Sequence, residues 1–468
     1  MKSKTYVLNI CAAAMILAAS NLSAQALRNA PPPPPTDTQI ELSKISDIGQ
    51  LMQKAEGWKS AGDMRRYTYA MERLLALRPY SPTFMYRLAE AYAIQDDKTR
   101  AYNLLIQVQK QGLAINPDKD KDFDPIRNTQ AFKYIIEGLE ANATPFGEGK
   151  VAITLKDAPE LIESLTYDAK GKRFLVGSVR TGEILSVSLD GKKQSVWAKP
   201  ATTVGLKSVF ALAADEARGF LWVGTAGAPQ YVDHKPADMG FAALLKMDLK
   251  TGKLIEAYPL PPAPTPRNFG SITVSSNGTV YATDALTNVI YQVQGGELRV
   301  LLTVPGSTSL RGIAVTPDQK FLYFVDYELG LRVADLSKSE VRDLSKDGQN
   351  LGGIDGLYFY KDHLIAVQNG SIPTRVLRIA LTPDHMAIKA VQPIEANKDV
   401  LEMPTYGAMV GDDFYFIPNS QRDVYDANGN PVAGFFPEAR KLYQVSARFA
   451  WQGEDAVGTQ GALPAKPE

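Results

Sequence analysis

The chain has 468 residues, of which 45% are hydrophobic and 22% are charged. This length is too great for one ordinary compact core, so we expect a globular protein of two or more domains. The 51 basic and 51 acidic residues give a formal net charge of zero, which argues against a nucleic acid partner.

The first segment of the chain has the pattern of a secretory signal peptide. Two lysines precede an apolar run, and small residues at Ala24 and Ala26 frame a cleavage site. We therefore expect a signal peptide over 1–26 and a periplasmic or secreted mature protein. The run is shorter than the roughly 20 residues that span a bilayer, so a membrane anchor is the less favoured alternative and no stable membrane insertion is expected. The single cysteine, Cys11, lies inside the run, so the mature chain cannot use disulfides or cysteine-bound metal.

A proline-rich linker and a helical segment are expected next. The proline run at 31–35 is stiff and extended, which indicates a linker over 27–38. From 39 to 145, apolar residues recur at three- and four-residue spacing, which predicts helices. With small residues at Ala89 and Ala101, the pattern resembles the tetratricopeptide repeat. This segment either packs against the next domain, which we favour, or holds a protein partner in its groove.

Strand periodicity follows, and one two-strand pattern occurs six times: a short β segment, a turn with Gly, Asp or Asn, and a dense apolar β segment. The apolar segments are 173–178, 220–225, 279–284, 321–326, 363–368 and 413–418. Their spacing of roughly 40 to 60 residues is typical of four-stranded propeller blades. We therefore predict a mainly β protein, with a six-bladed β-propeller over 146–452 after a small all-α tetratricopeptide-like domain. An early strand at 151–155 would complete the last blade, and the tail 453–468 is expected to be disordered.

Two long loops interrupt the blade pattern, at 226–240 and 259–269, and the second contains several prolines. Long loops on a rigid scaffold often shape a binding site, but proline-rich ones also serve as inert covers. The sequence favours neither interpretation.

Two carboxylates stand at corresponding places in separate blades. The first strand of a blade lies nearest the propeller axis, and Glu163 and Asp355 occupy the starts of two such strands. Convergent carboxylates repel each other unless a proton or a cation lies between them. The pair therefore indicates an oxygen-ligated metal site at the mouth of the channel.

The blade starts resemble those of the gluconolactonase and senescence-marker-protein (regucalcin) family over most of the expected propeller. Glu163, in the segment 162–168, stands where that family has a metal-binding glutamate, and Asp355, in the segment 354–357, matches its Asp-Gly motif. The resemblance implies a six-bladed propeller that binds one divalent cation, most readily calcium, with zinc or manganese as alternatives. It also implies hydrolysis of a sugar lactone or a related ester.

The resemblance gives each candidate residue a role. Glu163 and Asp355 would bind the cation, which would polarise the lactone carbonyl, while Asp355 would take the proton from the attacking water. Arg311, Asn268 and Asn369 would contact the lactone or sugar-like ligand.

The chain also departs from this family. Arg311 stands where the family has a metal-binding asparagine, and 269–270 align with its Asn-Asp pair, with Asn268 one residue away. Because a guanidinium carries a permanent positive charge, the simplest consequence is that no cation binds and that Arg311 pairs with Glu163 or Asp355. Such a pair would be a structural plug or a clamp for an anionic ligand. The alternative function is thus a non-catalytic ligand-binding or scaffolding propeller with a degenerate metal site.

Overall fold

The computed structural model of the chain describes residues 34–156, 158–307, 309–338, 340–345, 349–434 and 438–448. The chain forms two compact units, which meet in the sequence between Leu77 and Arg78. The expected signal peptide, most of the expected linker and the tail 453–468 lie outside the described residues, and the expected domain limits stay predictions. No helix in the described ranges is both long enough and apolar enough to cross a membrane.

The first unit contains three α-helices, namely α2 (Asp37–Ser43), α3 (Ile48–Ser60) and α4 (Met64–Leu77). Thr36 is the N-cap of α2, because its side chain accepts a hydrogen bond from the Gln39 amide and the Gln39 Oε1 accepts one from the Thr36 amide. Asp47 caps α3 in the simpler way, by accepting from the Gln50 amide. In α4, Tyr67 and Met71 are fully buried, so one face of the helix forms the core of this unit.

The second unit begins with four more α-helices: α5 (Pro82–Ile94), α6 (Lys98–Lys110), α7 (Asp124–Arg127) and α8 (Gln130–Asn142). Ser81 caps α5 and Pro82 occupies its first position, where the missing amide hydrogen costs nothing. Ala89 and Ala101, the two small residues of the repeat-like pattern, are fully buried. The described residues thus include seven α-helices before the propeller strands, as the periodicity predicts.

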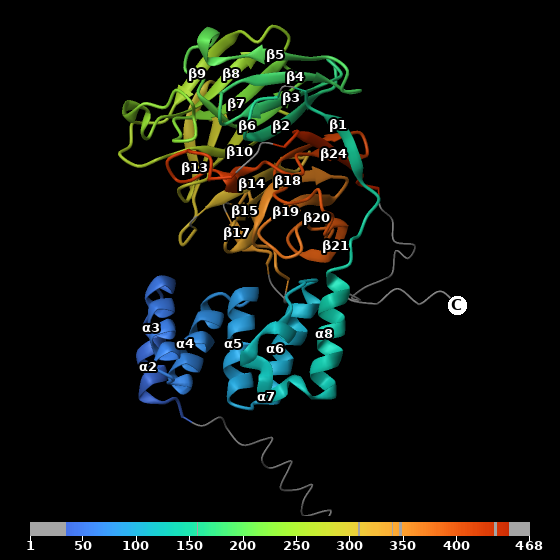
Figure 1. Cartoon of the computed structure of the whole chain (residues 1–468). Coiled ribbons are helices and arrows are strands. Elements are labelled where there is room, and N and C mark those ends of the chain that lie inside the picture. Colours follow the sequence, from blue (N-terminus) through green and yellow to red (C-terminus); the bar gives the residue numbers. More distant parts are fainter. Residues whose placement is uncertain are drawn as a thin grey trace, which may run out of the picture. The chain divides into compact units, whose positions relative to one another are not determined.

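The rest of the second unit is a six-bladed β-propeller, as predicted, built from six four-stranded antiparallel sheets within the described ranges (Figure 1). The first three blades contain β2 (Ile162–Asp168), β3 (Arg173–Ser178), β4 (Ile184–Ser188) and β5 (Gln194–Ala198); β6 (Ser208–Asp215), β7 (Phe220–Ala226), β8 (Ala242–Asp248) and β9 (Leu254–Pro259); and β10 (Phe269–Val274), β11 (Val280–Asp284), β12 (Val289–Gln294) and β13 (Glu297–Thr303).

The next three blades contain β14 (Leu310–Val315), β15 (Phe321–Asp326), β16 (Gly330–Asp335) and β17 (Glu340–Asp343); β18 (Ile354–Tyr360), β19 (His363–Gln368), β20 (Arg375–Leu381) and β21 (Ile388–Ala396); and β22 (Gly407–Val410), β23 (Asp413–Phe416), β24 (Lys441–Ser446) and β1 (Lys150–Thr154). In this last blade β1 pairs antiparallel with β24, opposing Val151 to Tyr443. The early strand therefore closes the ring and covers the edge of the final sheet, as expected from the sequence.

Apolar side chains fill the wedges between neighbouring blades. Trp222 of the second blade shares one buried cluster with Phe269 of the third. Across the closing junction, the ring of Phe174 in the first blade lies 4.9 Å from the ring of Tyr415 in the last. Flat rings suit these wedges because each buries a large apolar area between two twisted sheets. The core of the propeller is therefore a circle of inter-blade clusters around the axis.

Hydrogen bonds join the helical part of the second unit to the propeller. Arg375, at the start of β20, is buried, and its Nη1 donates hydrogen bonds to the carbonyl oxygens of Gln111 at 2.9 Å and Gly112 at 3.3 Å. The Ala114 amide donates to the Ile372 carbonyl at 2.8 Å. These contacts at the end of α6 favour the packing role for this part of the helical segment.

Candidate functional site

Five blades have an irregular register at the start of their innermost strand. The shifts lie between Ile162 and Ser164, Val209 and Ala211, Phe269 and Ser271, Leu310 and Ile313, and Ile354 and Gly356. The residues at the shifted positions are Glu163, Phe210, Gly270, Arg311 with Gly312, and Asp355. A β-bulge redirects a side chain out of the normal alternation of a strand. A β-bulge therefore recurs at each of these residues.

Glycine lets two of these bulges approach each other. A Cβ atom at Gly312 would lie 2.7 Å from the Cβ atom of Leu357 and 2.9 Å from the carbonyl oxygen of Asp355. Both contacts are with groups that cannot swing away. The glycine after Arg311 is therefore what brings the fourth blade close to Asp355 in the fifth.

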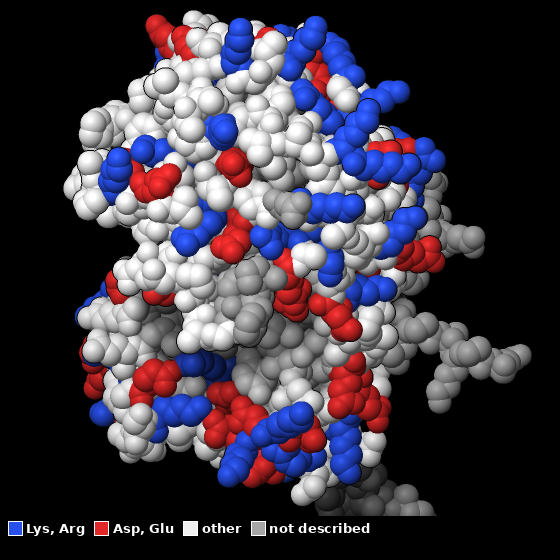
Figure 2. Space-filling view, turned by 45° about the horizontal axis from the view of Figure 1, so that its top comes forward, with Lys and Arg blue, Asp and Glu red and all other residues white. Residues whose placement is uncertain are grey.

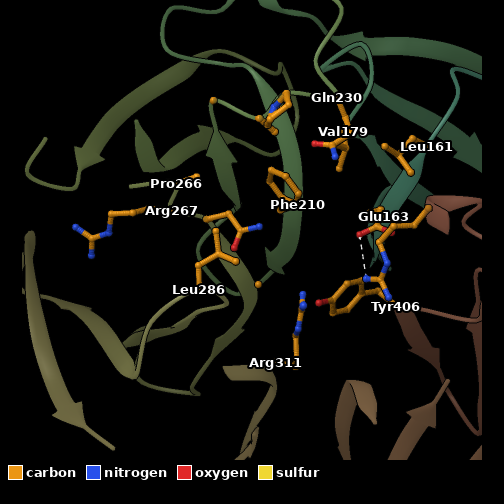
Figure 3. Close-up of a pocket in the computed structure, with 16 residues that line it drawn as sticks. Leu161, Glu163, Val179, Phe210, Gln230, Pro266, Arg267, Leu286, Arg311 and Tyr406 are labelled. Atoms are coloured by element: carbon orange, nitrogen blue, oxygen red, sulfur yellow. Dashed lines mark ion pairs between the residues drawn. The ribbon is translucent and has the colours of Figure 1, made fainter. Parts of the chain in front are cut away.

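Arg422 lies between the two predicted carboxylates. Its Nη2 donates a hydrogen bond to Asp355 Oδ2 at 3.1 Å, and its Nη1 lies 3.7 Å from Glu163 Oε2, the ion pair drawn dashed in Figure 3. Both carboxylates are buried, Glu163 with 5% and Asp355 with 0% of its surface exposed. The structure thus brings Glu163 and Asp355 together, as the sequence predicts, but around a guanidinium.

Arg311 contributes a second guanidinium on the other side of Asp355. Its Nε lies 3.7 Å from Asp355 Oδ1 and donates a hydrogen bond to Ser309 Oγ at 3.1 Å. The guanidinium carbon lies 5.6 Å from the centre of the Tyr327 ring. In the described part of the chain, the terminal Nη1 and Nη2 atoms of Arg311 have no hydrogen-bond partner, and the side chain is 23% exposed.

Asn369 fixes the position of the Asp355 carboxylate by a hydrogen bond. Its Nδ2 donates to Asp355 Oδ2 at 2.6 Å and to the Pro404 carbonyl at 2.8 Å, while its Oδ1 accepts from the Tyr327 hydroxyl at 2.8 Å. With its side chain committed to these partners, Asn369 is not among the residues that line the cavity. The structure therefore places it behind the site.

The environment moves the pKa values of the two carboxyls in opposite directions. Burial raises the pKa of Glu163, and the opposing charge of Arg422 does not cancel the rise. Burial would also raise the pKa of Asp355, but the charges of Arg422 and Arg311 and the Asn369 hydrogen bond outweigh it, so this pKa is lowered. Asp355 is thus the stable anion of the pair, and Glu163 is the more readily protonated.

A cavity of about 260 Å³ opens beside this cluster (Figure 3). Its polar lining is Glu163, Gln230, Arg267, Asn268, Arg311, Tyr406 and Arg422, and its apolar lining includes Leu161, Val179, Phe210, Pro266 and Leu286. The volume is near the lower end of the roughly 300–1,000 Å³ that small-molecule sites occupy. Both long loops contribute, through 227–230 and 266–268, which favours the interpretation that they shape a site.

The polar residues of the cavity have different orientations. Arg311 and the hydroxyl of Tyr406 point toward the same space, whereas Arg267 extends away from it (Figure 3). Arg267 is committed elsewhere, because its Nε and Nη2 donate to Asp284 Oδ2 at 3.2 Å. Asn268 lines the cavity, and its buried Oδ1 has no hydrogen-bond partner among the described residues. Asp355 does not line the cavity, since the two guanidiniums and Asn369 surround it.

Sequence reasoning missed Arg422. The residue lies outside the strand repeats, on a short 3₁₀ turn, η5 (Arg422–Val424), that follows the last blade's second strand. Gln421 before it has a φ of 59°, and the Ser420 hydroxyl accepts from the Arg422 amide at 3.3 Å. The available signal was the charge count, since two buried carboxylates and one arginine leave a negative charge that needs a further partner.

The residues at the mouth do not fit a resident divalent cation. Two carboxylates and two guanidiniums already balance each other, and Arg422 takes the place between Glu163 and Asp355. A divalent ion there would add two positive charges to a neutral, largely buried cluster, at a cost that no described ligand offsets. This arrangement matches the degenerate site that Arg311 suggests in the sequence.

Another carboxylate group lies in the helical part of the second unit. Oxygen atoms of Glu90, Asp120 and Asp122 lie within 4.8 Å of one another, and the Tyr86 hydroxyl donates to Asp120 Oδ2 at 3.1 Å. The group is remote in sequence from the predicted cation ligands. Glu90 is buried, and Asp120 and Asp122 are half-buried.

Neither sign of charge dominates the face of the molecule that is drawn in Figure 2. Figure 2 shows basic and acidic side chains interspersed over the face that it displays. The pattern agrees with the formal net charge of zero.

No family model matches the chain, and no curated protein matches it in sequence. Similar solved structures include a calcium-binding regucalcin from Agrobacterium tumefaciens, 17% identical, with a TM-score of 0.42, covering 65% of this chain and 96% of that one. A gluconolactonase from Xanthomonas campestris is 12% identical, with a TM-score of 0.43 and coverage of 65% and 92%. A virginiamycin B lyase from Staphylococcus aureus is 19% identical, with a TM-score of 0.41 and coverage of 57% and 82%. At these values the likeness decides neither the family nor the activity of this chain.

Proposed function

We propose that the mouth of the propeller binds a small organic molecule through a carboxylate group. The observation that carries this proposal is Arg311, whose terminal nitrogens line the cavity without a hydrogen-bond partner among the described residues. The planar fork of a guanidinium matches the two oxygens of a carboxylate, and such charge-assisted pairs are about twice as strong as neutral hydrogen bonds. The free end of the Arg311 guanidinium can therefore bind one carboxylate group of a ligand.

The rest of the ligand is expected to be apolar or mixed in character. Phe210, Leu286 and Pro266 offer an apolar wall, Tyr406 offers a hydroxyl beside Arg311 (Figure 3), and Asn268 offers a polar atom elsewhere in the lining. A few polar groups in a largely apolar concavity fix the orientation of a ligand whose body supplies most of the buried area. A lactone-derived or sugar-like acid with an apolar face would meet both requirements.

Asp355 has a supporting role in this proposal. It is fully buried, and its oxygens face Arg422 and Arg311 instead of the cavity. A buried anion that pairs with two guanidiniums fixes their positions and keeps both charges in place before a ligand arrives. Asp355 is therefore proposed as a positioning residue for the arginines.

Calorimetric titration with phenylacetate and with phenylacetamide tests the proposal, because the two probes share a ring and differ in charge. We expect the acid to bind and the amide to bind at least tenfold more weakly. Arg311→Gln should weaken phenylacetate binding about ten- to hundredfold, the loss of one charged hydrogen-bonding partner. Arg299→Gln, which changes an exposed arginine on β13, is the matched control and should leave binding unchanged.

Two results would contradict carboxylate recognition: equal affinities for the acid and the amide, or acid binding that survives Arg311→Gln. A screen of acetate, hexanoate, phenylacetate and gluconate without any binding would contradict it as well.

Hydrolysis of a lactone or ester is a second candidate, favoured by one observation on Glu163. This residue lines the cavity, its pKa is raised by burial, and its buried Oε1 has no hydrogen-bond partner in the described part of the chain. Glu163 would take a proton from the attacking water as the C–O bond forms and return it to the leaving oxygen as the ester bond breaks. Arg311 would stabilise the oxyanion and then hold the carboxylate product.

Hydrolysis of glucono-δ-lactone, followed with a pH-stat in the presence of EDTA, tests this second candidate. The proposal expects turnover without a divalent ion and its loss in Glu163→Gln, with Glu297→Gln, at an exposed position, as the control. Turnover that survives Glu163→Gln, or that requires an added cation, would exclude the mechanism.

Export and a protein partner of the helical segment stay predictions. N-terminal sequencing of the protein from the cell that makes it would show whether cleavage follows Ala26. Affinity capture would test for a protein partner. It would compare the full-length wild type with full-length variants that carry charge reversals within residues 39–145.

A further inference from the structure

We propose that Arg422 is an internal counter-cation that occupies the position of a divalent ion, and that removing its guanidinium turns the propeller mouth into a cation site. The inference concerns Arg422, whereas the proposed ligand site depends on Arg311, so the two can fail separately.

The contacts of Arg422 are those that a bridging cation would make. One guanidinium reaches Glu163 in the first blade and Asp355 in the fifth, at 3.7 Å and 3.1 Å. Without a positive charge between them, two buried carboxylates cannot both stay ionised. Arg422 therefore satisfies the electrostatic need that the sequence pattern assigns to a metal ion.

Oxygen atoms suited to a hard cation are already in place. Glu163 Oε1 and Asp355 Oδ1 are buried and have no hydrogen-bond partner among the described residues. Carboxylate and amide oxygens are the ligands that calcium prefers. With the guanidinium absent, Glu163 Oε2 would lose its arginine and become available as well, while Asp355 Oδ2 would keep only its hydrogen bond from Asn369.

The turn that carries Arg422 is fixed independently of its side chain. The Gln421 amide donates to Asn419 Oδ1 at 2.9 Å, and the Tyr425 hydroxyl donates to Glu160 Oε2 at 2.7 Å. Tyr425 also packs in a small apolar cluster with Leu161 and Val179. Loss of the guanidinium should therefore open space between the carboxylates and leave the backbone of the turn in place.

Arg311 limits how tightly an ion can bind once Arg422 is removed. Its Nε stays 3.7 Å from Asp355 Oδ1, so one positive charge still faces the site. A single substitution at Arg422 leaves two carboxyl groups against one guanidinium, so a cation that binds both groups restores the positive charge that Arg422 supplied. Removing Arg311 as well should strengthen binding further, because the remaining repulsion disappears.

Calorimetric titration of metal-free protein with calcium chloride and manganese chloride tests the inference. We expect no binding in the wild type and one site in Arg422→Met, with a dissociation constant of about 1 mM or tighter, as in extracellular calcium modules. Arg422→Lys keeps a positive charge and should not bind. The double variant Arg311→Asn, Arg422→Met should bind the cation at least tenfold more tightly than Arg422→Met alone. Adding Glu163→Gln to the double variant should abolish this increase in affinity.

Thermal unfolding gives a second measurement, because a ligand that binds only the folded state raises Tm. The protein is unfolded without calcium and with calcium at about ten times the dissociation constant expected for Arg422→Met. Calcium should raise the Tm of Arg422→Met and leave that of the wild type unchanged, even if the variant is less stable. One-site cation binding by the wild type would overturn the inference. So would the absence of both binding and a Tm rise in Arg422→Met and in the double variant.

Discussion

Asn369 donates a 2.6 Å hydrogen bond to Asp355 Oδ2, the same oxygen that receives Arg422. The amide and the guanidinium thus share one atom of a fully buried carboxylate. The rest of the Asn369 side chain is fixed by Pro404 and Tyr327. Asn369 therefore connects the backbone of the last inter-blade loop to the charge cluster.

Replacing Asn369 with alanine should lower the free energy of unfolding by about 1–3 kcal/mol, since buried polar partners lose their hydrogen bonds. Asp355 keeps Arg422 and Arg311, so we expect a folded protein. Urea unfolding measures the change. Asn428→Ala, at an exposed turn, is the control, and equal stability of the two variants would contradict the role of Asn369.

Arg375 links the end of α6 to the propeller, and burial lowers its pKa to about 10. Its Nε donates to Gln368 Oε1 at 2.6 Å. Arg375→Met would leave the Gln111 carbonyl without this donor, and we expect a loss of about 2–3 kcal/mol. Hydrogen exchange should also accelerate at residues 111–114 more than in the outer strands. Uniform acceleration over the whole unit would argue against a local role.

The raised pKa of Glu163 predicts a pH dependence of stability. Glu163 holds a proton more readily in the folded protein than in the unfolded chain. Its contribution to the free energy of unfolding is therefore most favourable below the ordinary pKa of 4.5 and declines as pH rises through the raised pKa. Glu163→Gln removes this dependence. The difference in unfolding free energy between wild type and variant should therefore shift in favour of the variant as pH rises from 4.5.

Urea titrations at several pH values between about 4 and 8 would measure this difference, since a shifted carboxyl changes stability only between its two pKa values. Glu297→Gln, at an exposed position, serves as the control. A difference that stays constant over the range, or moves in favour of the wild type, contradicts the raised pKa.

The closing junction of the ring predicts a large effect of one aromatic residue. Phe174 is fully buried and its ring lies 4.9 Å from that of Tyr415. Phe174→Ala should cost about 3–5 kcal/mol, because a cavity forms between the first and last blades, and Phe174→Leu should cost less. Chemical unfolding measures both. Similar losses in the two variants would show that volume in this wedge is unimportant.

The propeller could be predicted from the sequence because its signal is repeated and local. Each blade buries an apolar second strand, so segments such as 321–326 and 363–368 stand out by composition and spacing. Closure by β1 followed from the same periodicity, since a lone early strand needs a partner. The helices were visible for a similar reason, because small residues such as Ala89 recur at helical spacing.

The charge cluster was only half predictable. Glu163, Asp355 and Arg311 occupy equivalent strand starts, so their convergence follows from the repeat. Arg422 follows from nothing periodic, because it lies on a connection between two strands and not at the start of an innermost strand. Its position depends on how a connection folds back over the channel, and such long-range geometry leaves no local pattern in a single sequence.

Ring closure has a consequence for the order of synthesis. The final blade joins β1 to β24, which ends at Ser446, so the circle cannot be completed until almost the whole chain has been made. Until then β1 has an unpaired edge, and edges of this kind recruit strands from other molecules. A polypeptide truncated before Lys441 lacks β24 and is therefore expected to associate with its own copies. In the intact chain, β24 of the same molecule pairs with β1.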